Sequence, residues 1–240
     1  TGKLQEMNYG IVHYDSPDER GIDVALLYNK CNFNPLFSRP IPILFPFDSS
    51  DRTRDILYVK GLLDDDDSLH IFINHWPSRW GGQEKTAPAR NFVAGILKKT
   101  CDSIFTENKE ANIIIMGDFN DNPTDESLAE ELNALMPKQN PPTDALYNLM
   151  LAPYKRGVGS YYYSYGKEWN MLDQIIVSGN LLKPSSNIRT THQEGQIFKA
   201  EWMSYMNNDS IMVPSRTKGS KYYGGYSDHF PVHFELIKQR

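Results

Sequence analysis

Short apolar segments separated by polar turns recur along the whole chain. Several of these segments are rich in β-branched and aromatic residues, which is typical of β-strands. The strands predicted in this way are 22–28, 56–63, 69–74, 112–116, 171–177 and 230–236. A run of consecutive acidic residues, Asp64 to Asp67, lies between the second and the third of them. Because such a run cannot be buried, we predict a hairpin loop there and antiparallel pairing of its two strands.

Two segments have the spacing of apolar residues that is typical of helices. Between Pro88 and Phe105 apolar residues recur at helical intervals, which predicts a helix that covers a sheet face. A shorter helix is predicted after Thr124, a candidate N-cap that is followed by acidic residues. Hairpins combined with crossover helices favour an α+β sandwich over a doubly wound parallel sheet. Residues 182–221 lack a dependable periodicity and are predicted to run over the surface.

The length and composition are typical of one globular domain, which we expect to comprise residues 1–240. No apolar run approaches the roughly 20 residues that span a bilayer, so we expect a soluble protein without a membrane span. The net charge of −5 provides no general attraction to polyanions. Cys31 and Cys101 lie far apart without the spacing of a zinc motif or a disulfide framework. Nothing indicates an obligate protein partner, and the compartment stays open, with a secreted or periplasmic location slightly favoured.

Polar side chains with catalytic chemistry follow two of the predicted strands. His75 follows the strand 69–74, and Asp118 and Asn120 follow the strand 112–116 after Gly117, which allows another group to approach the backbone. If the chain stays extended through Asn120, the side chains of Asp118 and Asn120 point to one side. A carboxylate there can bind a hard cation or accept a proton from water, and an amide can orient a phosphate. The alternatives are a histidine that only hydrogen-bonds a loop and an Asx-turn that leads into a helix.

Two further acidic residues and a histidine belong to the last third of the chain. Asp173 lies inside an otherwise apolar strand, which is costly unless the carboxylate has a partner such as a histidine. The alternative is an acid that points outward from an edge strand. Asp228 and His229 precede the final strand. Because adjacent strand residues face opposite ways, these two can share a site only where the backbone bends.

Five segments carry a resemblance to a known family. They are Arg20 to Tyr28, Asn74-His75-Trp76-Pro77-Ser78, Gly117-Asp118-Phe119-Asn120, Leu172-Asp173-Gln174-Ile175 and Ser227-Asp228-His229-Phe230-Pro231-Val232. In this order they resemble the endonuclease/exonuclease/phosphatase family, which includes pancreatic DNase I, apurinic endonucleases, neutral sphingomyelinases and inositol polyphosphate 5-phosphatases. The resemblance implies a four-layer α/β/β/α sandwich with its site at one end of two facing sheets. It also implies metal-dependent hydrolysis of a phosphoester by attack of water, without a covalent enzyme intermediate.

The resemblance assigns roles to the polar residues. Asp118 would orient or deprotonate the attacking water, and Asn120 would help to hold the phosphate. His229 would contact the phosphate oxygens, with Asp173 fixing its tautomer and favouring the imidazolium. Asp228 would be a ligand of a Mg²⁺ or Mn²⁺ ion, which neutralises the phosphate and stabilises the leaving oxygen.

Further contacts to the substrate are expected from neighbouring residues. His75 resembles a second phosphate-contacting histidine, and Ser78, Arg79 and Arg90 are candidate substrate-binding residues. For each arginine a salt bridge is the alternative. The substrate stays open between a nucleic acid, a lipid head group and a sugar or inositol phosphate, because all of them suit the same reaction centre.

The chain also departs from the family pattern. The family has an early strand that ends in an asparagine and another that ends in a metal-binding glutamate, both before the segment Arg20 to Tyr28. Neither motif is present, Glu6 and Glu19 stand in the wrong context, and the chain begins at Thr1 without a charged and apolar leader. We therefore expect an N-terminally truncated domain that lacks at least one strand and a principal metal ligand, and that binds metal more weakly.

A non-catalytic ligand-binding module that keeps the sandwich is the rival interpretation. The joint presence of the polar residues at the strand ends favours an enzyme. Aromatic residues in the loops could stack on bases or sugars, or they could merely cover the edge of the core. These residues are Trp76, Trp80, Trp169, Tyr161 to Tyr163, Tyr165, Tyr222 and Tyr223.

Overall fold

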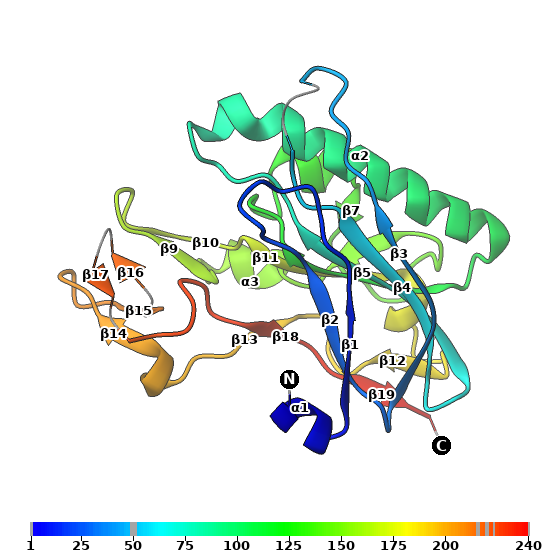
Figure 1. Cartoon of the computed structure of the whole chain (residues 1–240). Helices are drawn as coiled ribbons and strands as arrows, with labels where there is room; N and C mark the ends of the chain where they lie inside the picture. Colours follow the sequence, from blue (N-terminus) through cyan, green and yellow to red (C-terminus); the bar gives the residue numbers. More distant parts are fainter. Residues whose placement is uncertain (1, 49–51, 215–216, 219–220, 223, 240) are drawn as a thin grey trace.

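A seven-stranded mixed sheet forms the centre of the protein (Figure 1). The structure is a computed structural model and describes residues 2–48, 52–214, 217–218, 221–222 and 224–239. The strand order is β3-β4-β5-β6-β11-β8-β7. The bounds are β3 Phe33–Ile41, β4 Ile56–Leu63, β5 Asp67–His75, β6 Asn112–Asp118, β7 Ala134–Leu135, β8 Leu146–Asn148 and β11 Asp173–Ser178.

A long helix covers one face of this sheet (Figure 1). This helix is α2, Gln83–Glu107, and it buries Val93, Leu97 and Cys101 against the sheet, which agrees with the predicted apolar stripe. The predicted second helix is shorter than expected. It is a single π-helical segment, η1 Ser127–Glu131, whose N-cap position is Glu126 and not Thr124.

The opposite face is covered by three separate strand pairs. They are β1 Tyr9–His13 with β2 Ala25–Asn29, β12 Ile188–Thr190 with β19 Leu236–Lys238, and β13 Gln196–Ile197 with β18 Val232–His233. Val12, Leu26 and Leu236 from these pairs pack against a second core that contains Val59 and Ile175 of the central sheet. The predicted α+β sandwich is therefore present, but its second layer consists of separate strand pairs and not of one continuous sheet. In place of the predicted strand 230–236 the chain forms two short strands, β18 and β19.

Shorter elements complete the described chain. The helices are α1 Gly2–Glu6, α3 Leu151–Lys155, η2 Gly179–Leu182 and η3 Glu201–Met203, and the remaining strands are β9 Tyr161–Tyr163, β10 Glu168–Asn170, β14 Ser204–Met206, β15 Met212–Pro214, β16 Thr217–Lys218 and β17 Lys221–Tyr222. The segment predicted as an irregular excursion thus contains several short paired strands. Of the helices that the structure describes, none combines the length and the apolar composition that crossing a membrane requires.

The register of the central strands brings three polar residues into one row. β5 and β6 are parallel and pair His75 with Asp118, while β6 and β11 are antiparallel and pair Asp118 with Asp173. Neighbouring strands lie roughly 4.8 Å apart, so three strands place their chemically active ends side by side. The predicted antiparallel pairing of β4 with β5 is also present, with Leu63 opposite Asp67.

A buried ion pair fixes the chain where β5 ends. Arg54 Nη1 lies 3.0 Å from Asp18 Oδ2, and both side chains are 3% exposed. Arg54 also donates to the carbonyl oxygens of His75, at 3.0 Å, and Trp76, at 2.6 Å. The side-chain hydrogen bond from Arg20 is the largest influence that holds the pKa of Asp18 well below its usual range. Arg54 and Asp18 thus position the backbone of the first residue in the row.

Replacing Asp18 by asparagine leaves Arg54 as a buried charge without its counterion. We expect Asp18→Asn to lower the free energy of unfolding by about 3–5 kcal/mol, measured by urea denaturation. The matched control is Glu194→Gln, which removes the exposed ion pair between Arg156 and Glu194 and should leave the urea midpoint unchanged. Equal midpoint shifts for the two variants would show that the Asp18–Arg54 pair has no special structural role.

Candidate active site

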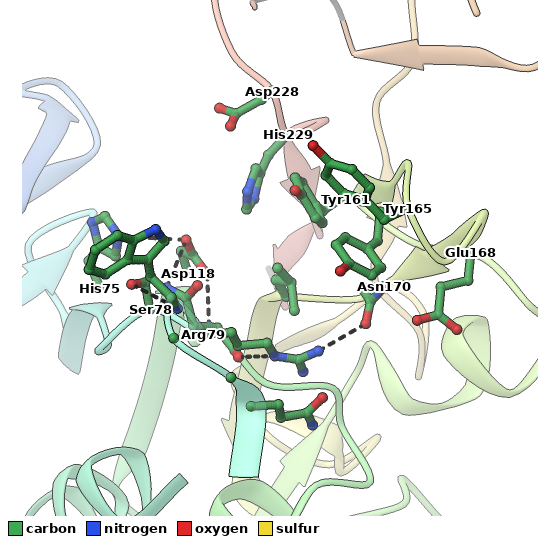
Figure 2. Close-up of a pocket in the computed structure, with 17 residues that line it drawn as sticks. His75, Ser78, Arg79, Asp118, Tyr161, Tyr165, Glu168, Asn170, Asp228 and His229 are labelled. Atoms are coloured by element: carbon green, nitrogen blue, oxygen red, sulfur yellow. Dashed lines mark hydrogen bonds and ion pairs between the residues drawn. The ribbon is translucent and has the colours of Figure 1, made fainter. Parts of the chain in front are cut away.

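A cavity of about 690 Å³ opens at the end of the central sheet where the row of polar residues lies (Figure 2). Most of the predicted site residues line it, namely His75, Ser78, Arg79, Asp118, Asn120, Asp228 and His229. Asp173 does not line the cavity, but its side chain is hydrogen-bonded to that of His229. Strand ends and loops that are far apart in the sequence thus bring these residues together.

The ends of β5 and β6 approach each other closely because of one glycine. Gly117 has a φ of +136°, and a Cβ atom at this position would collide with the carbonyl oxygen of Asn74. Trp76 and Phe119, which follow these two strands, are buried with their ring centroids 4.5 Å apart, and Trp76 Nε1 donates to Asn74 Oδ1 at 3.0 Å. The predicted close approach at Gly117 is therefore a contact between the two backbones, next to a buried aromatic pair.

Asp118 and Asn120 form a turn and not a continued strand. The backbone N–H of Asn120 donates to Asp118 Oδ1 at 2.8 Å, and Asn120 has a φ of +51°. The expectation of extended geometry through Asn120 is thus wrong, because β6 ends at Asp118 and the carboxylate closes an Asx-turn. Both side chains nevertheless line the cavity. The Asn120 amide nitrogen donates to the carbonyl oxygen of Trp76 at 3.1 Å, so the amide oxygen is the atom it can offer to a ligand.

His229 is held as a cation by the acidic residues around it. Its Nδ1 lies 2.7 Å from Asp173 Oδ2. Burial alone would lower the pKa of His229, but the hydrogen bond to Asp173 and the charges of Asp173, Asp118 and Asp228 outweigh it and raise this pKa to about 9. The Nδ1–H therefore donates to Asp173, and at neutral pH the ring carries a positive charge beside the cavity.

The other two members of the row have shifted pKa values as well. Burial, followed by the charge of Asp173, raises the pKa of Asp118 to about 6. Burial, followed by the charge of Arg54, lowers the pKa of His75 to about 4. His75 Nε2 lies 3.6 Å from Asp118 Oδ2. At neutral pH, His75 is therefore a neutral polar neighbour of Asp118 and not its ionic partner.

The two candidate arginines behave differently. Arg79 lines the cavity, and it donates from Nε to the carbonyl oxygen of Asn120 at 2.6 Å and from Nη2 to Asp125 at 2.8 Å. Arg90 is wholly buried, its Nε lies 2.7 Å from Asp121 Oδ2, and it does not line this cavity. The expectation that Arg90 binds substrate is therefore wrong, and the alternative is correct: Arg90 forms a buried salt bridge with Asp121. Arg79 fixes the turn that contains Asn120.

Three residues that line the cavity escaped the sequence analysis, Gln83, Glu168 and Asn170. For Glu168 and Asn170 the signal that could have found them was a hairpin with alternating faces, because Tyr163 and Tyr161 stand opposite them. For Gln83 no local signal distinguishes it from a surface residue. Figure 2 shows Glu168 across the cavity from His75.

The aromatic residues divide between the core and the cavity. Trp76 is buried, and Trp169 stacks against Phe230 with ring centroids 5.9 Å apart, so both belong to the packing. Trp80 and Tyr165 are 91% and 93% exposed although both line the cavity. Tyr223, which was also a candidate for stacking, lies outside the described residues.

The donor chemistry of the site fits a hard divalent cation. Asp118, Asp173 and His229 offer ligand atoms within 4.8 Å of one another. His229 is protonated and paired with Asp173, so its nitrogen does not serve as a ligand. Asp228, the predicted metal ligand, lies exposed on the cavity wall outside that group. Burial, followed by the charge of Asp173, raises the pKa of Asp118, and a cation held by carboxylate and amide oxygens would stabilise the ionised carboxylate.

Comparison with known proteins relates residues 1–238 to one family. The model of the endonuclease/exonuclease/phosphatase family matches residues 1–238. No curated protein matches the chain. The human Nocturnin catalytic domain with bound sulfate is 15% identical, with a TM-score of 0.59 over 100% of this chain and 76% of that one. A mannosyl-6-phosphatase of Bacteroides thetaiotaomicron is 16% identical, with a TM-score of 0.60 over 98% and 81%. Truncated TDP2 of Caenorhabditis elegans is 15% identical, with a TM-score of 0.56 over 96% and 75%.

The opposite charge states of the two cavity histidines can be measured by NMR titration. We expect the His229 ring to titrate near pH 9 and the His75 ring near pH 4. Asp173→Asn removes the bond and the charge that favour the imidazolium, so it should lower the pKa of His229. His70, whose pKa burial lowers to about 4 beside Tyr58, is the internal control and should not move. A pKa of His229 at or below the ordinary histidine value in the unaltered protein would contradict this charge assignment.

Proposed function

Because the chain belongs to the endonuclease/exonuclease/phosphatase family, we propose that the cavity hydrolyses a phosphoester by direct attack of water with the help of a divalent cation. The observation that carries the proposal is the pair formed by Asp118 and His229. One is a carboxylate whose pKa of about 6 suits a proton acceptor, and the other is a cation at neutral pH. Both belong to the same cavity.

Asp118 is the residue that would activate the water. A general base works best when its pKa lies near the operating pH, and burial beside Asp173 moves that of Asp118 in this direction. The N–H of Asn120 fixes one carboxylate oxygen, Oδ1, at 2.8 Å. The carboxylate is therefore held in one orientation while it accepts the proton. The water attacks phosphorus directly, and no covalent enzyme intermediate forms.

His229 is the residue that would stabilise negative charge on the phosphate. Its Nδ1 is committed to Asp173, which leaves the N–H at Nε2 for a phosphate oxygen. A preorganised cation in a partly water-excluded cavity interacts more strongly with developing charge than the same group in bulk water. Neutral His75 and Ser78 add hydrogen-bonding groups around the same phosphate, whereas the Asn120 amide has its oxygen left for a ligand and not a donor.

The divalent cation, Mg²⁺ or Mn²⁺, would be held by carboxylate oxygens of Asp118, with the Asn120 amide oxygen beside it. Asp228, exposed on the cavity wall, is the further ligand that the family resemblance implies. When bound, it neutralises the phosphate and stabilises the leaving oxygen. One structural neighbour is a mannosyl-6-phosphatase, which supports the proposal of phosphoester chemistry on this fold. Phosphate esters react extremely slowly without a catalyst, so the combination of a base, a fixed cation and a metal is chemically reasonable.

The proposal is tested by hydrolysis of bis-p-nitrophenyl phosphate and p-nitrophenyl phosphate with Mg²⁺ or Mn²⁺. We expect turnover of one or both that a chelator abolishes. Asp118→Ala should lower kcat/KM by about 10²–10⁴, the usual range for loss of general acid–base catalysis. His229→Ala should lower kcat/KM by about 10²–10³, the usual range for loss of a group that stabilises developing charge. The control is Asp102→Ala on the exposed side of α2, which should retain full activity.

Circular dichroism of each variant would separate loss of chemistry from loss of folding. A folded protein that turns over neither ester with any divalent metal would contradict the proposal. It would favour the rival interpretation, a non-catalytic binding module with the same fold.

The dependence of kcat/KM on pH should form a bell. Asp118 acts in its ionised form, so activity is lost as the pH falls below about 6. His229 acts as the imidazolium, so activity is lost as the pH rises above about 9. Asp173→Asn removes the charge that raises both pKa values, and the whole bell should then move to lower pH. A bound cation favours the Asp118 carboxylate, so the profile is recorded at one metal concentration. An acid limb that did not move in Asp173→Asn would argue against Asp118 as the base.

A further inference from the structure

We propose, on the basis of the hydrolysis proposed above, that the hairpin β9–β10 binds the leaving group of the substrate. Its residue Glu168 selects a leaving group that is uncharged and rich in hydroxyl groups, as in a sugar or a cyclitol. The substrate class is thus a phosphate ester of a polyhydroxylated small molecule.

One face of the hairpin forms a wall of the cavity. Tyr161 stands opposite Asn170, and Tyr163 stands opposite Glu168. Because alternate strand residues share a face, these four side chains point to the same side, and all of them line the cavity. The other face carries Tyr162 and Trp169, which pack into the protein. The packing of Tyr162 and Trp169 therefore holds the hairpin in place against the protein.

The hairpin begins at the reaction centre and leads away from it. Tyr161 forms a β-bridge with His229, and their ring centroids are 5.0 Å apart. Tyr163 and Glu168 lie two residues further along their strands, which is roughly 7 Å in an extended chain. A phosphate bound at His229 would therefore place the next part of the substrate, about the length of one sugar ring, beside Tyr163 and Glu168.

Aromatic surface at this end of the cavity is exposed to solvent. Tyr165, in the hairpin turn, is 93% exposed, and its ring centroid lies 5.9 Å from that of Tyr163. Trp80, which also lines the cavity, is 91% exposed. Packing of the core does not require these rings. Rigid aromatic faces with a few polar groups between them are typical of sites for small ligands.

The charges at this end disfavour a second phosphate. Of the described residues that line the cavity, Arg79 is the sole lysine or arginine, and it is bonded to Asp125 at 2.8 Å and to Asn170 at 3.1 Å. Glu168 and Asp228 contribute negative charge to the lining. A second phosphate on the leaving group would thus meet the negative charge of Glu168, and among the described lining residues only Arg79 could offset it. Hydroxyl groups, in contrast, donate strong hydrogen bonds to a carboxylate.

Two ligands with the same sugar test this selection, glucose 6-phosphate and glucose 1,6-bisphosphate, with myo-inositol 1-phosphate as a second polyol. We expect higher kcat/KM for the monophosphates than for the bisphosphate. Glu168→Gln should lower kcat/KM for glucose 6-phosphate about tenfold, the usual effect of losing hydrogen bonds to a charged group. It should leave p-nitrophenyl phosphate unchanged. Glu168→Lys should raise the rate with the bisphosphate. The matched control is Glu110→Gln, an exposed glutamate remote from the cavity lining.

The outcomes separate this inference from the proposed function. If p-nitrophenyl phosphate is hydrolysed but Glu168→Gln affects it as strongly as glucose 6-phosphate, or if the bisphosphate is preferred, the leaving-group inference is overturned and the hydrolase proposal stands. If no ester is hydrolysed, calorimetric binding of glucose 6-phosphate decides. Binding that weakens about tenfold in Glu168→Gln but not in Glu110→Gln would support the proposed sugar-binding surface, although the hydrolase proposal would fail. Binding that is undetectable, or that is the same in Glu168→Gln, would overturn the leaving-group inference.

Discussion

The register that aligns β5, β6 and β11 is the constraint on which the rest of the site depends. It places His75, Asp118 and Asp173 on neighbouring strands in one row, so two partly buried carboxylates lie side by side. Two such charges repel each other at low dielectric and need a cation between them. The chain supplies one from its last segment, where His229 contacts Asp173 at 2.7 Å.

The local structure around the row serves to keep this arrangement. Gly117 removes the side chain that would separate β5 from β6. Arg54, paired with Asp18 in the interior, holds the carbonyl oxygens at the end of β5. Arg79 does the same for the turn that contains Asn120. Arg54 and Arg79 thus use their charged groups to hold the backbone. The positive charge left beside the phosphate is that of His229, and a divalent cation would supply the rest.

The charge pattern also explains how one cavity can contain both a proton acceptor and a fixed cation. Asp118 and His229 both have raised pKa values, but for different reasons: burial beside a like charge for the carboxyl, and opposite charges that outweigh burial for the imidazole. Between about pH 6 and pH 9 one is a carboxylate and the other an imidazolium. Chemistry that needs both forms together is therefore favoured over a broad range around neutral pH.

Much of this site could be predicted from the sequence because its residues stand at the ends of apolar strands. The bounds of β4, the hairpin to β5, and the need of Asp173 for a histidine all followed from local patterns. The strand β3 was missed because Pro35 and Pro40 argue against a strand, and they are tolerated because β3 lies at the edge of the sheet.

Other features depended on information that is not local. Burial of Arg90 against Asp121 is decided by how α2 packs, and an isolated arginine in a helix does not reveal it. The turn at Asn120 follows from a side-chain hydrogen bond that competes with the extended chain. To predict the hairpin wall with Glu168, one would need to know that two very short strands pair and that they lie beside His229. Neither composition nor periodicity contains this information.

A crystal structure with Mn²⁺ and inorganic phosphate would test the central claim most directly, because the anomalous signal of manganese locates the metal independently of the phosphate. The account predicts one phosphate between Asp118 and His229, and a manganese peak in contact with the Asp118 carboxylate. Manganese and phosphate bound together elsewhere on the protein, with this cavity left to solvent, would contradict it.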